Sequence, residues 1–260
     1  MGIVNVTPDS FSDGGVYFSR EAAITYCVQL AEAGADIIDI GGESTRPGAV
    51  SVSTAEELER VLPVIEAVAS RVTVPISIDT TKAVVARKAL AAGAQIVNDV
   101  SALRFDPEMA GVVAESGAPV VLMHMRGTPQ TMQTDIHYAS LIDDIRAFLE
   151  ERIAAAVQQG IAVENIIIDP GIGFGKSIEK DNFSILKHVG AFAALGRPIL
   201  VGPSRKAFIG RLLNVPVNER EEGTAAAVAI AIYNGAHMVR VHDVKSMKRA
   251  ALVAHAIKRV

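Results

Sequence analysis

The sequence lacks the features that mark several large classes of protein. Its 260 residues include one cysteine, Cys27, so no intrachain disulfide can form, and we expect a buried thiol in a reducing compartment. No apolar run reaches the ~18 residues of a membrane span, so we expect no membrane segment. Basic residues are not in excess either, because the net charge is −4. This balance argues against a nucleic-acid partner.

Two further absences concern the organisation of the chain. No Pro/Ser-rich or charged linker interrupts it, so we expect residues 1–260 to form one domain. The opening residues fit neither a signal peptide nor a myristoylation site, since Val6 stands where the latter needs Ser or Thr. We therefore expect a cytoplasmic protein.

What the sequence does contain is a regular alternation of short apolar runs with amphipathic stretches, repeated roughly every 30 residues. Eight runs are rich in β-branched residues and nearly continuous in apolar character, as parallel strands covered on both faces are. They are Gly2–Val6, Asp36–Ile40, Pro75–Asp79, Gln95–Asp99, Pro119–Met123, Asn165–Asp169, Pro198–Gly202 and His237–Val241. Helices are expected between them, among others at Arg20–Glu32, Thr54–Ala69, Thr81–Ala92, Tyr138–Gln159, Glu222–Asn234 and Asp243–Lys258. Eight such units predict an α/β fold, a closed (β/α)8 TIM barrel.

Local signals support several helix ends. Ser53, followed by Glu56 and Glu57, is typical of a helix start with acidic residues in the first turn. Gly34, Gly93 and Gly235 each precede a predicted strand. A glycine there ends a helix in the left-handed conformation and returns the chain to the sheet.

Polar residues concentrate after the predicted strands, where barrel enzymes carry their chemistry. One group suits a phosphate-type anion, because it combines cations with neutral donors: Asn5, Thr45, Arg46, Lys206, Arg240 and His242. We expect Arg240 and His242 to face this anion rim rather than the floor of the barrel mouth. The alternative is that these side chains are solvated or paired with loop acids.

A second polar group consists of Asp79, Asn98 and Asp169, at the ends of predicted strands three, four and six. Inward carboxylates and an amide there would make a floor for a flat heterocycle that offers adjacent N–H donors. The alternative is a layer of core residues that satisfy one another. A metal cluster is less favoured, because the six histidines show no zinc-type spacing.

Two loops have ambiguous patterns. Residues 169–177 (DPGIGFGKS) end like a Walker A loop, but Pro170 stands where its first glycine belongs and supplies no N–H. We therefore expect a flexible loop with Lys176 in solvent. Residues 7–15 carry Asp9, Phe11 and Asp13 beside a glycine pair, so they form either a closing loop or a plain surface loop.

Several longer motifs resemble the hallmark loops of dihydropteroate synthases. They are residues 5–15 (NVTPDSFSDGG), 41–48 (GGESTRPG), 124–129 (HMRGTP), 169–174 (DPGIGF), 204–206 (SRK) and 240–243 (RVHD), in the family's order. The resemblance implies a transferase of folate biosynthesis that joins 6-hydroxymethyl-7,8-dihydropterin diphosphate to 4-aminobenzoate. It also implies Mg²⁺, a homodimer and inhibition by sulfonamides. Pro203 and Ala207 depart from the Thr and Ser common in the family.

The resemblance also assigns roles residue by residue. It implies a pterin site formed by Asp79, Asn98, Met123, Asp169 and Lys206. It implies a diphosphate site formed by Asn5, also the magnesium ligand, with Thr45, Arg46, Arg240 and His242. It implies an aminobenzoate pocket formed by Phe11, Thr45, Pro47, Phe174, Lys206 and Ala207. Asp13 would help to organise the transition state, so the catalytic set is Asp13, Lys206, Arg240 and His242.

Three rival functions remain open from the sequence. A pterin-dependent methyltransferase shares the barrel and its floor, but it would lack the loops at residues 41–48 and 204–206. A P-loop nucleotide-binding module is disfavoured by Pro170. A catalytically silent pterin-binding barrel is distinguished only by a turnover measurement.

Overall fold

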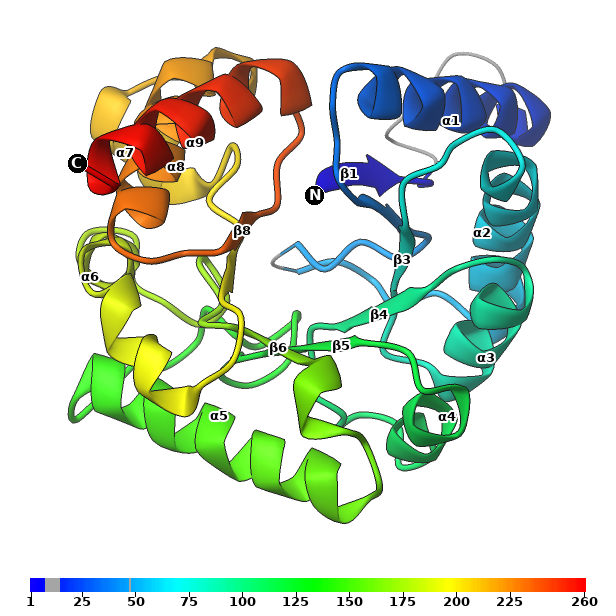
Figure 1. The fold of residues 1–260 in the computed structure, drawn as a ribbon, viewed down its shortest axis with the longest axis horizontal. Coiled ribbons are helices and arrows are strands. Elements are labelled where there is room, and N and C mark those ends of the chain that lie inside the picture. Colours follow the sequence, from blue (N-terminus) through cyan, green and yellow to red (C-terminus); the bar gives the residue numbers. More distant parts are fainter. Residues whose placement is uncertain (8–14, 47) are drawn as a thin grey trace.

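The structure, a computed structural model, describes residues 1–7, 15–46 and 48–260, with the backbone alone for residues 15–19. Parallel strands form a central ring, and helices surround it (Figure 1). The strands are β1 (Gly2–Asn5), β2 (Ile38–Gly41), β3 (Ile76–Asp79), β4 (Ile96–Asp99), β5 (Val120–Met123), β6 (Ile166–Asp169), β7 (Leu200–Val201) and β8 (Met238–Val239). Each lies within or beside a predicted run.

The ring closes through two short junctions. Strands β1 to β6 form one parallel sheet, and β7 and β8 form a separate parallel pair. Single bridges join the pair to both edges of the sheet, at Ile168 with Ile199 and at Gly2 with Val241. At the second junction the Ile3 N–H donates to the Val241 carbonyl oxygen over 3.0 Å. The prediction of a TIM barrel is confirmed.

The helices cover the outside of the ring. They are α1 (Gly15–Glu32), α2 (Thr54–Ala69), α3 (Ala83–Ala91), α4 (Met109–Ser116), α5 (Leu141–Gln158), α6 (Asp181–Lys187), α7 (Ala207–Leu213), α8 (Glu221–Tyr233) and α9 (Val244–Lys258). Short 3-10 helices occur at η2 (Val163–Asn165), η3 (Val189–Leu195) and η4 (Val217–Glu219). Within the described ranges, none of the helices has the length and apolar character needed to span a membrane.

The predicted helix ends are confirmed. The Ser53 hydroxyl accepts the Glu56 N–H at 3.2 Å and so caps α2. Gly34, Gly93 and Gly235 have φ values of +96°, +116° and +116°, the left-handed region that returns each helix to the sheet.

The main core lies between the strand ring and the helix layer. Its fully buried side chains include Ile38, Ile78, Ile166 and Leu149 from both layers. Cys27 on α1 is also fully buried, as predicted, and burial raises the pKa of its thiol to about 12. This thiol is therefore an apolar packing group and not a nucleophile.

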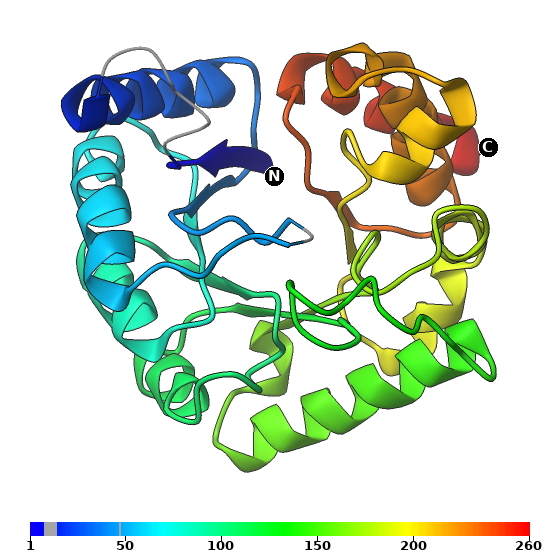
Figure 2. The same cartoon turned by 180° about the vertical axis from the view of Figure 1, so that it is seen from behind.

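Strand register aligns the residues that end the strands. Asn5 is paired with Gly41, Gly41 with Asp79, and Asp79 with Asn98 across β1 to β4. On the other side of the ring, Met123 of β5 is paired with Asp169 of β6. The loops after β2, β5 and β6 lie over the centre of the ring (Figure 2). The register thus brings the predicted floor residues to one level beneath these loops.

Candidate functional site

The floor of the barrel mouth is polar and buried. Asp79, Asn98 and Asp169 are 7%, 4% and 6% exposed. Beneath them lies Asp39 of β2, which is fully buried and which the sequence analysis missed. Its Oδ2 accepts a hydrogen bond from Asn98 Nδ2 at 3.1 Å. The signal for Asp39 was present, since it is a carboxylate inside an apolar run, where an unpaired charge is costly.

Arg240, which follows β8, binds two floor carboxylates. Its Nε donates to Asp39 Oδ2 at 2.6 Å, and its Nη2 donates to Asp79 Oδ2 at 2.7 Å. The prediction that Arg240 faces the rim rather than the floor is therefore wrong. A guanidinium inside the barrel mouth loses water and needs carboxylates in exchange.

The charges of this trio are interdependent. Burial by itself would lower the pKa of Arg240, but Asp39 and Asp79 outweigh it and raise that pKa above its ordinary value. Burial raises the pKa of Asp79, although the adjacent Arg240 opposes the shift. Two carboxylates share one guanidinium, so the buried trio retains excess negative charge when all its groups are ionised.

Asp169 ends β6 and is oriented by the backbone that follows it. Its Oδ1 accepts the Gly171 N–H at 2.7 Å. Burial raises the pKa of Asp169 to about 6, while the Gly171 N–H and Lys206 act in the opposite direction. The carboxylate thus has one oxygen fixed by the loop and a second available for a ligand.

Lys206, at the start of α7, is half-buried and has no internal hydrogen-bond acceptor. Its Nζ lies 4.3 Å from the centre of the Phe174 ring. Nowhere in the described part of the chain does an acceptor lie within hydrogen-bonding distance of this ammonium group. Burial lowers its pKa to about 8, and Arg240 adds to the lowering while Asp169 and Asp79 oppose it. This cation is available to a ligand.

The loop after β7 is held so that Lys206 points into the mouth. Arg205 has φ +56°, a strained conformation for a side chain of its size. Its N–H donates to Thr224 Oγ1 at 3.1 Å, and its carbonyl accepts from Arg220 Nη1 at 2.9 Å. Arg220 fits because Gly210 has no side chain, since a Cβ there would lie 2.2 Å from Arg220 Nε.

His242 is a neutral donor near the same cations. Ser204 Oγ accepts the His242 backbone N–H at 3.2 Å and lies 2.9 Å from Nδ1. The Ser204 hydrogen is then free to be donated to Nδ1, which leaves the ring proton on Nε2. Burial, followed by the charges of Arg205 and Arg240, lowers the pKa of His242 to about 3.

The loop after β2, which carries Thr45 and Arg46, is tied to the barrel by an ion pair. Lys82 Nζ lies 2.5 Å from Glu43 Oε2 and 2.5 Å from Oε2 of the fully buried Glu57. Asn5 and Thr45 are half-buried and Arg46 is exposed. The charge of Arg46 contributes to the lowered pKa values of both Lys206 and His242, so it belongs to the same cationic rim.

An apolar wall adjoins the polar floor. It is a small cluster, separate from the main core, that consists of Val100, Met123, Met125, Met132 and Phe174. Met123 and Phe174 are 4% and 9% exposed. A flat ring above the floor carboxylates would meet this wall, and Lys206 lies over its Phe174 face.

Lys176 is not in solvent, so that prediction is wrong. Its side chain is fully buried, and Nζ lies 2.8 Å from His124 Nδ1. It also donates to the carbonyl oxygens of Gly171 and Phe174, at 3.1 and 2.9 Å. The sequence could not show this, because His124 follows a different strand.

Several predicted residues are not part of this geometry. Asp9, Phe11, Asp13 and Pro47 lie outside the described residues. Ala207 is described, as the exposed first residue of α7. Among residues 1–7, 15–46 and 48–260, no three His, Cys, Asp or Glu side chains are grouped to hold a metal. The roles assigned to all these residues stay predictions.

A (β/α)8 barrel with a carboxylate floor, an apolar wall and a cationic rim defines an enzyme that binds a flat polar heterocycle next to an anion. Comparison with known families agrees with this class. A sequence model of the family described as pterin binding enzyme matches residues 1–242.

The relatives are more specific. The chain is 51% identical to dihydropteroate synthase of Synechocystis, over all of this chain and 90% of that protein. It is 49% identical to the Bacillus subtilis enzyme of the same name, over 99% and 87% of the two chains. The chain belongs to the dihydropteroate synthase family, and it is a transferase of folate biosynthesis.

Solved structures of this family match the whole chain. The Yersinia pestis dihydropteroate synthase in complex with a sulfonamide drug has a TM-score of 0.94 and 45% identity, covering 100% of this chain and 94% of that one. The Xanthomonas albilineans enzyme has been solved in complex with 7,8-dihydropteroate, with a TM-score of 0.90 and 45% identity. That match covers 100% and 93% of the two chains. The same enzyme with 4-aminobenzoic acid has a TM-score of 0.93 and 48% identity, covering 100% and 93%.

Proposed function

We propose that this chain condenses 6-hydroxymethyl-7,8-dihydropterin diphosphate with 4-aminobenzoate to give 7,8-dihydropteroate and diphosphate. The observation that carries this proposal is the juxtaposition of a carboxylate floor with unengaged cationic and neutral donors. Asp79 and Asp169 lie below, and Lys206 and His242 lie at the rim. A pterin diphosphate needs both parts of the site at once, because its ring N–H groups require the acceptors of the floor and its diphosphate requires the donors of the rim.

The pterin ring occupies the floor. Asp169 keeps one carboxylate oxygen free after accepting the Gly171 N–H, and Asp79 keeps one free after binding Arg240. These oxygens and the Asn98 amide accept the ring N–H groups, while Met123 packs against one ring face. Lys206 donates to the ring from the Phe174 side. Each acceptor paired with a buried donor avoids a desolvation cost of about 1–3 kcal/mol.

The diphosphate occupies the rim. His242 donates through Nε2, Arg46 contributes charge, and Asn5 and Thr45 add neutral donors. Arg240 is already held by Asp39 and Asp79, so it presents only its remaining N–H groups to the diphosphate. These donors stabilise the charge that grows on the departing oxygen as the C–O bond breaks.

The 4-aminobenzoate site lies at the mouth, beside Phe174, Lys206 and Ala207. Phe11, Thr45, Pro47 and Asp13 complete it, an assignment that rests for Phe11, Pro47 and Asp13 on the sequence motifs. The amine nitrogen forms a bond to the pterin methylene carbon as diphosphate leaves, and the nitrogen then loses one proton. Positioning the amine in line replaces a bimolecular encounter. Sulfonamides compete for this pocket.

Mg²⁺ fits the rim as a partner of the diphosphate. Asn5 offers a hard amide oxygen, and magnesium commonly takes only one or two protein ligands, with the remainder from phosphate oxygens and water. When bound, the ion would neutralise charge on the leaving diphosphate. Asn5, at the end of β1, would orient the diphosphate toward the floor.

The test is an assay of diphosphate release by the purified chain. We expect release only when dihydropterin diphosphate and 4-aminobenzoate are both present, with 7,8-dihydropteroate identified by mass and activity lost after chelation of magnesium. Release that does not depend on 4-aminobenzoate, or a methyl transfer to a thiol acceptor without release, would overturn the proposal. Pterin binding without turnover would establish the catalytically silent barrel instead.

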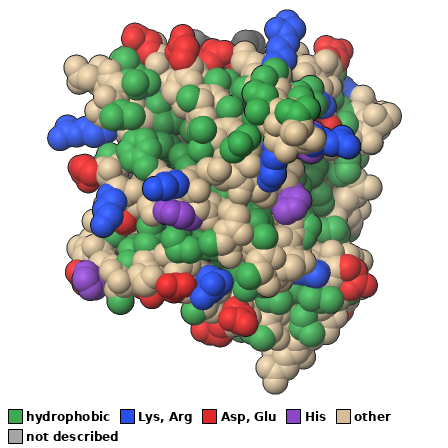
Figure 3. All heavy atoms as spheres, turned by 60° about the vertical axis from the view of Figure 1, so that its left-hand side comes forward, with side chains coloured by type: hydrophobic (Ala, Val, Ile, Leu, Met, Phe, Trp, Pro, Cys, Tyr) green, Lys and Arg blue, Asp and Glu red, His purple; other side chains and the backbone are tan. Residues whose placement is uncertain are grey.

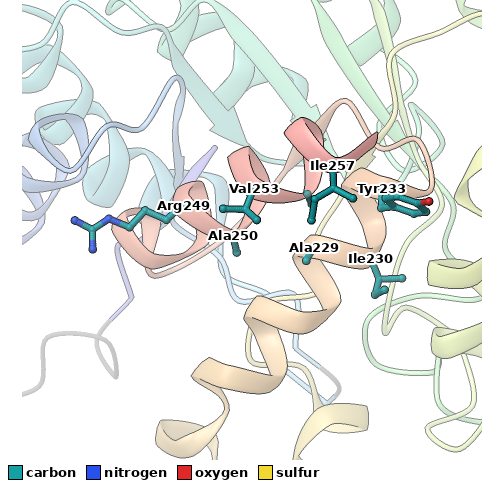
Figure 4. Close-up of a pocket in the computed structure, with 8 residues that line it drawn as sticks. Ala229, Ile230, Tyr233, Arg249, Ala250, Val253 and Ile257 are labelled. Atoms are coloured by element: carbon teal, nitrogen blue, oxygen red, sulfur yellow. The ribbon is translucent and has the colours of Figure 1, made fainter. Parts of the chain in front are cut away.

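The chain is also proposed to form a homodimer through an apolar surface on α8 and α9, on the side that Figure 3 turns forward. Tyr233 is 51% exposed, Leu252 59%, Val253 61% and Ile257 58%, high values for apolar side chains. Tyr233, Val253 and Ile257 line a shallow hollow of about 460 Å³ (Figure 4), together with Ala229, Ile230, Arg249, Ala250 and Ala254. Contiguous exposed apolar surface of this kind marks protein interfaces.

Sedimentation of the whole chain tests the dimer. We expect a dimer for the parent and a monomer for Val253→Glu, because a carboxylate at the centre of the surface would lose its water. The matched control is Val84→Glu on α3, which is 44% exposed and far from α8 and α9 in the fold. A monomeric parent, or equal effects of both variants, would overturn this interface. Residues 1–260 are proposed to act as one domain in the cytoplasm.

A further inference from the structure

The loop after β6 is built around one buried ammonium group. Lys176 Nζ has three N–H donors and three acceptors: His124 Nδ1, Gly171 O and Phe174 O, at 2.8 to 3.1 Å. A buried cation is tolerated when every donor is matched, and the match here is complete. Two of the acceptors belong to the Lys176 loop itself, and the third lies after β5.

The same loop lies flat against the segment after β5. Gly171 and Gly175 have φ values of +74° and +65°. A Cβ at Gly171 would lie 1.9 Å from the His124 carbonyl oxygen, and one at Gly175 would lie 2.7 Å from Arg126 Cβ. Tyr138, from the neighbouring segment, donates its hydroxyl to the Gly175 carbonyl at 2.6 Å. The loop is therefore closely packed against the segment after β5 and against Tyr138, with Lys176 at its centre.

Lys176 binds the two parts of the loop that contact site residues. The Gly171 N–H orients Asp169, and the Gly171 carbonyl accepts from Lys176. The Phe174 carbonyl also accepts from Lys176, and the Phe174 ring supports Lys206. The Lys176 ammonium group thus connects the Asp169 carboxylate, through Gly171, to the Phe174 ring that Lys206 contacts.

We propose that Lys176 is a positioning residue of the dihydropteroate synthase site, which sets the Phe174 wall and the Asp169 carboxylate through Gly171 and never touches substrate. The proposal rests on the function proposed above. Neutral His124 supports it: burial, followed by the charge of Lys176, lowers the pKa of His124 to about 2, so its Nδ1 stays an acceptor. His124 itself is fixed edge-on against Phe148, with ring centres 4.8 Å apart.

The variant Lys176→Met keeps the length of the side chain and removes its donors. We expect amide hydrogen exchange at residues 171–175 to accelerate at least tenfold in the free protein. In turnover, we expect KM for 4-aminobenzoate to rise at least fivefold with kcat lowered less, because the Phe174 wall moves while the rim donors stay. Lys176→Gln, which retains an amide donor, should recover part of both effects.

The matched control is Lys180→Met, which removes the same charge from an exposed side chain of the same segment. It should leave exchange and KM unchanged. Amide exchange in the free protein tests the positioning role independently of turnover. If the parent showed no turnover, only the proposed function would be overturned. Parent-like exchange and KM in Lys176→Met overturn the proposal, as do effects shared equally by Lys180→Met. Failure of both Lys176 variants to fold would also overturn it, since the lysine would then determine the whole fold.

Discussion

Two lysines follow neighbouring strands at the barrel mouth, and their surroundings differ. Lys176, after β6, is fully buried and has three acceptors within 3.1 Å. Lys206, after β7, is half-buried, and its ammonium group lies over the Phe174 ring without a hydrogen-bond acceptor among the described residues. Burial lowers the pKa of both, to about 7 for Lys176 and about 8 for Lys206.

The difference separates scaffold from site. A buried polar group whose bonding is complete stabilises its own loop, whereas one without a partner costs free energy until a ligand supplies one. Arg240 combines both conditions, because two of its N–H groups bind Asp39 and Asp79 and the others are free. The predictions below test this distinction.

Arg240→Met should have the largest effect, on stability as well as on turnover. It leaves Asp39 and Asp79 buried without their cation, which typically costs about 3–5 kcal/mol of unfolding free energy. Urea denaturation measures this loss. Arg46→Met, at an exposed position, is the control and should change the unfolding free energy by less than about 0.5 kcal/mol. If the Arg240→Met variant were as stable as the parent, Arg240 would resemble Lys206, whose donors serve only a ligand, and its bonds to Asp39 and Asp79 would not contribute to stability.

Lys206→Met should lower kcat/KM by about 10- to 100-fold, because a hydrogen bond from a charged group contributes about 1.5–3 kcal/mol. Its unfolding free energy should change little, since no internal hydrogen bond is lost and the contact with the Phe174 ring is replaced by apolar packing of the methionine. Steady-state kinetics and denaturation on the same preparation give both values. If Lys206→Met lost stability and Lys176→Met did not, the distinction between scaffold and site would be reversed.

Asp169→Asn should weaken pterin binding by about 1–3 kcal/mol, because an acceptor pair becomes a mixed donor and acceptor. The pKa of Asp169 is raised to about 6, chiefly by burial, so pterin affinity of the parent should fall as pH drops through 6. The free energy of unfolding depends on pH in the opposite direction. The raised pKa favours the protonated folded state, so this group's contribution to stability is present below pH 3.8 and lost as pH rises through 6.

Calorimetry at pH 5 and pH 8 distinguishes these effects. The parent should bind a 6-hydroxymethyl pterin more weakly at pH 5. Asp169→Asn should show a smaller difference between the two pH values, and the remaining difference comes from Asp79, whose pKa burial also raises. Equal affinity of parent and variant at pH 8 would remove Asp169 from the pterin site.

Ala207→Ser should have the smallest effect. Ala207 is exposed at the start of α7, where an added hydroxyl would be partly hydrated. It should contribute about 0.5–1.5 kcal/mol, so KM for 4-aminobenzoate should fall by at most about tenfold. Sulfonamide inhibition should tighten in parallel. Opposite shifts for substrate and drug would show that residue 207 does not contact what the two ligands share.

The sequence predicted the strands well because each is short, apolar and β-branched, and the pattern is local. The Ser53 cap and the Gly34 and Gly93 helix ends were predicted for the same reason. Short helices such as α6 and α7, seven residues each, carry too little periodicity to stand out.

The site was harder to predict where a residue's environment depends on another strand. Lys176 is buried because His124 offers an acceptor 52 residues earlier in the chain. Arg240 turns to the floor because Asp39 lies 201 residues earlier. Neither partner can be read from local spacing, although the charge of Asp39 inside an apolar strand was a usable signal.

The closure of the ring has a consequence for how the barrel forms and opens. Contacts across this seam join opposite ends of the described fold. The Ile3 N–H of β1 donates to the Val241 carbonyl oxygen after β8, and the Met1 nitrogen, just before β1, donates to the Val239 carbonyl oxygen of β8, 238 positions later. Loop-closure entropy opposes such distant contacts, so this seam assembles late in folding. A single bridge and a two-residue β8 make this junction short, and local opening should begin there. Arg240 lies next to this seam and bonds across it to Asp39 of β2 and Asp79 of β3, so the active-site ion pairs also help to keep the barrel closed.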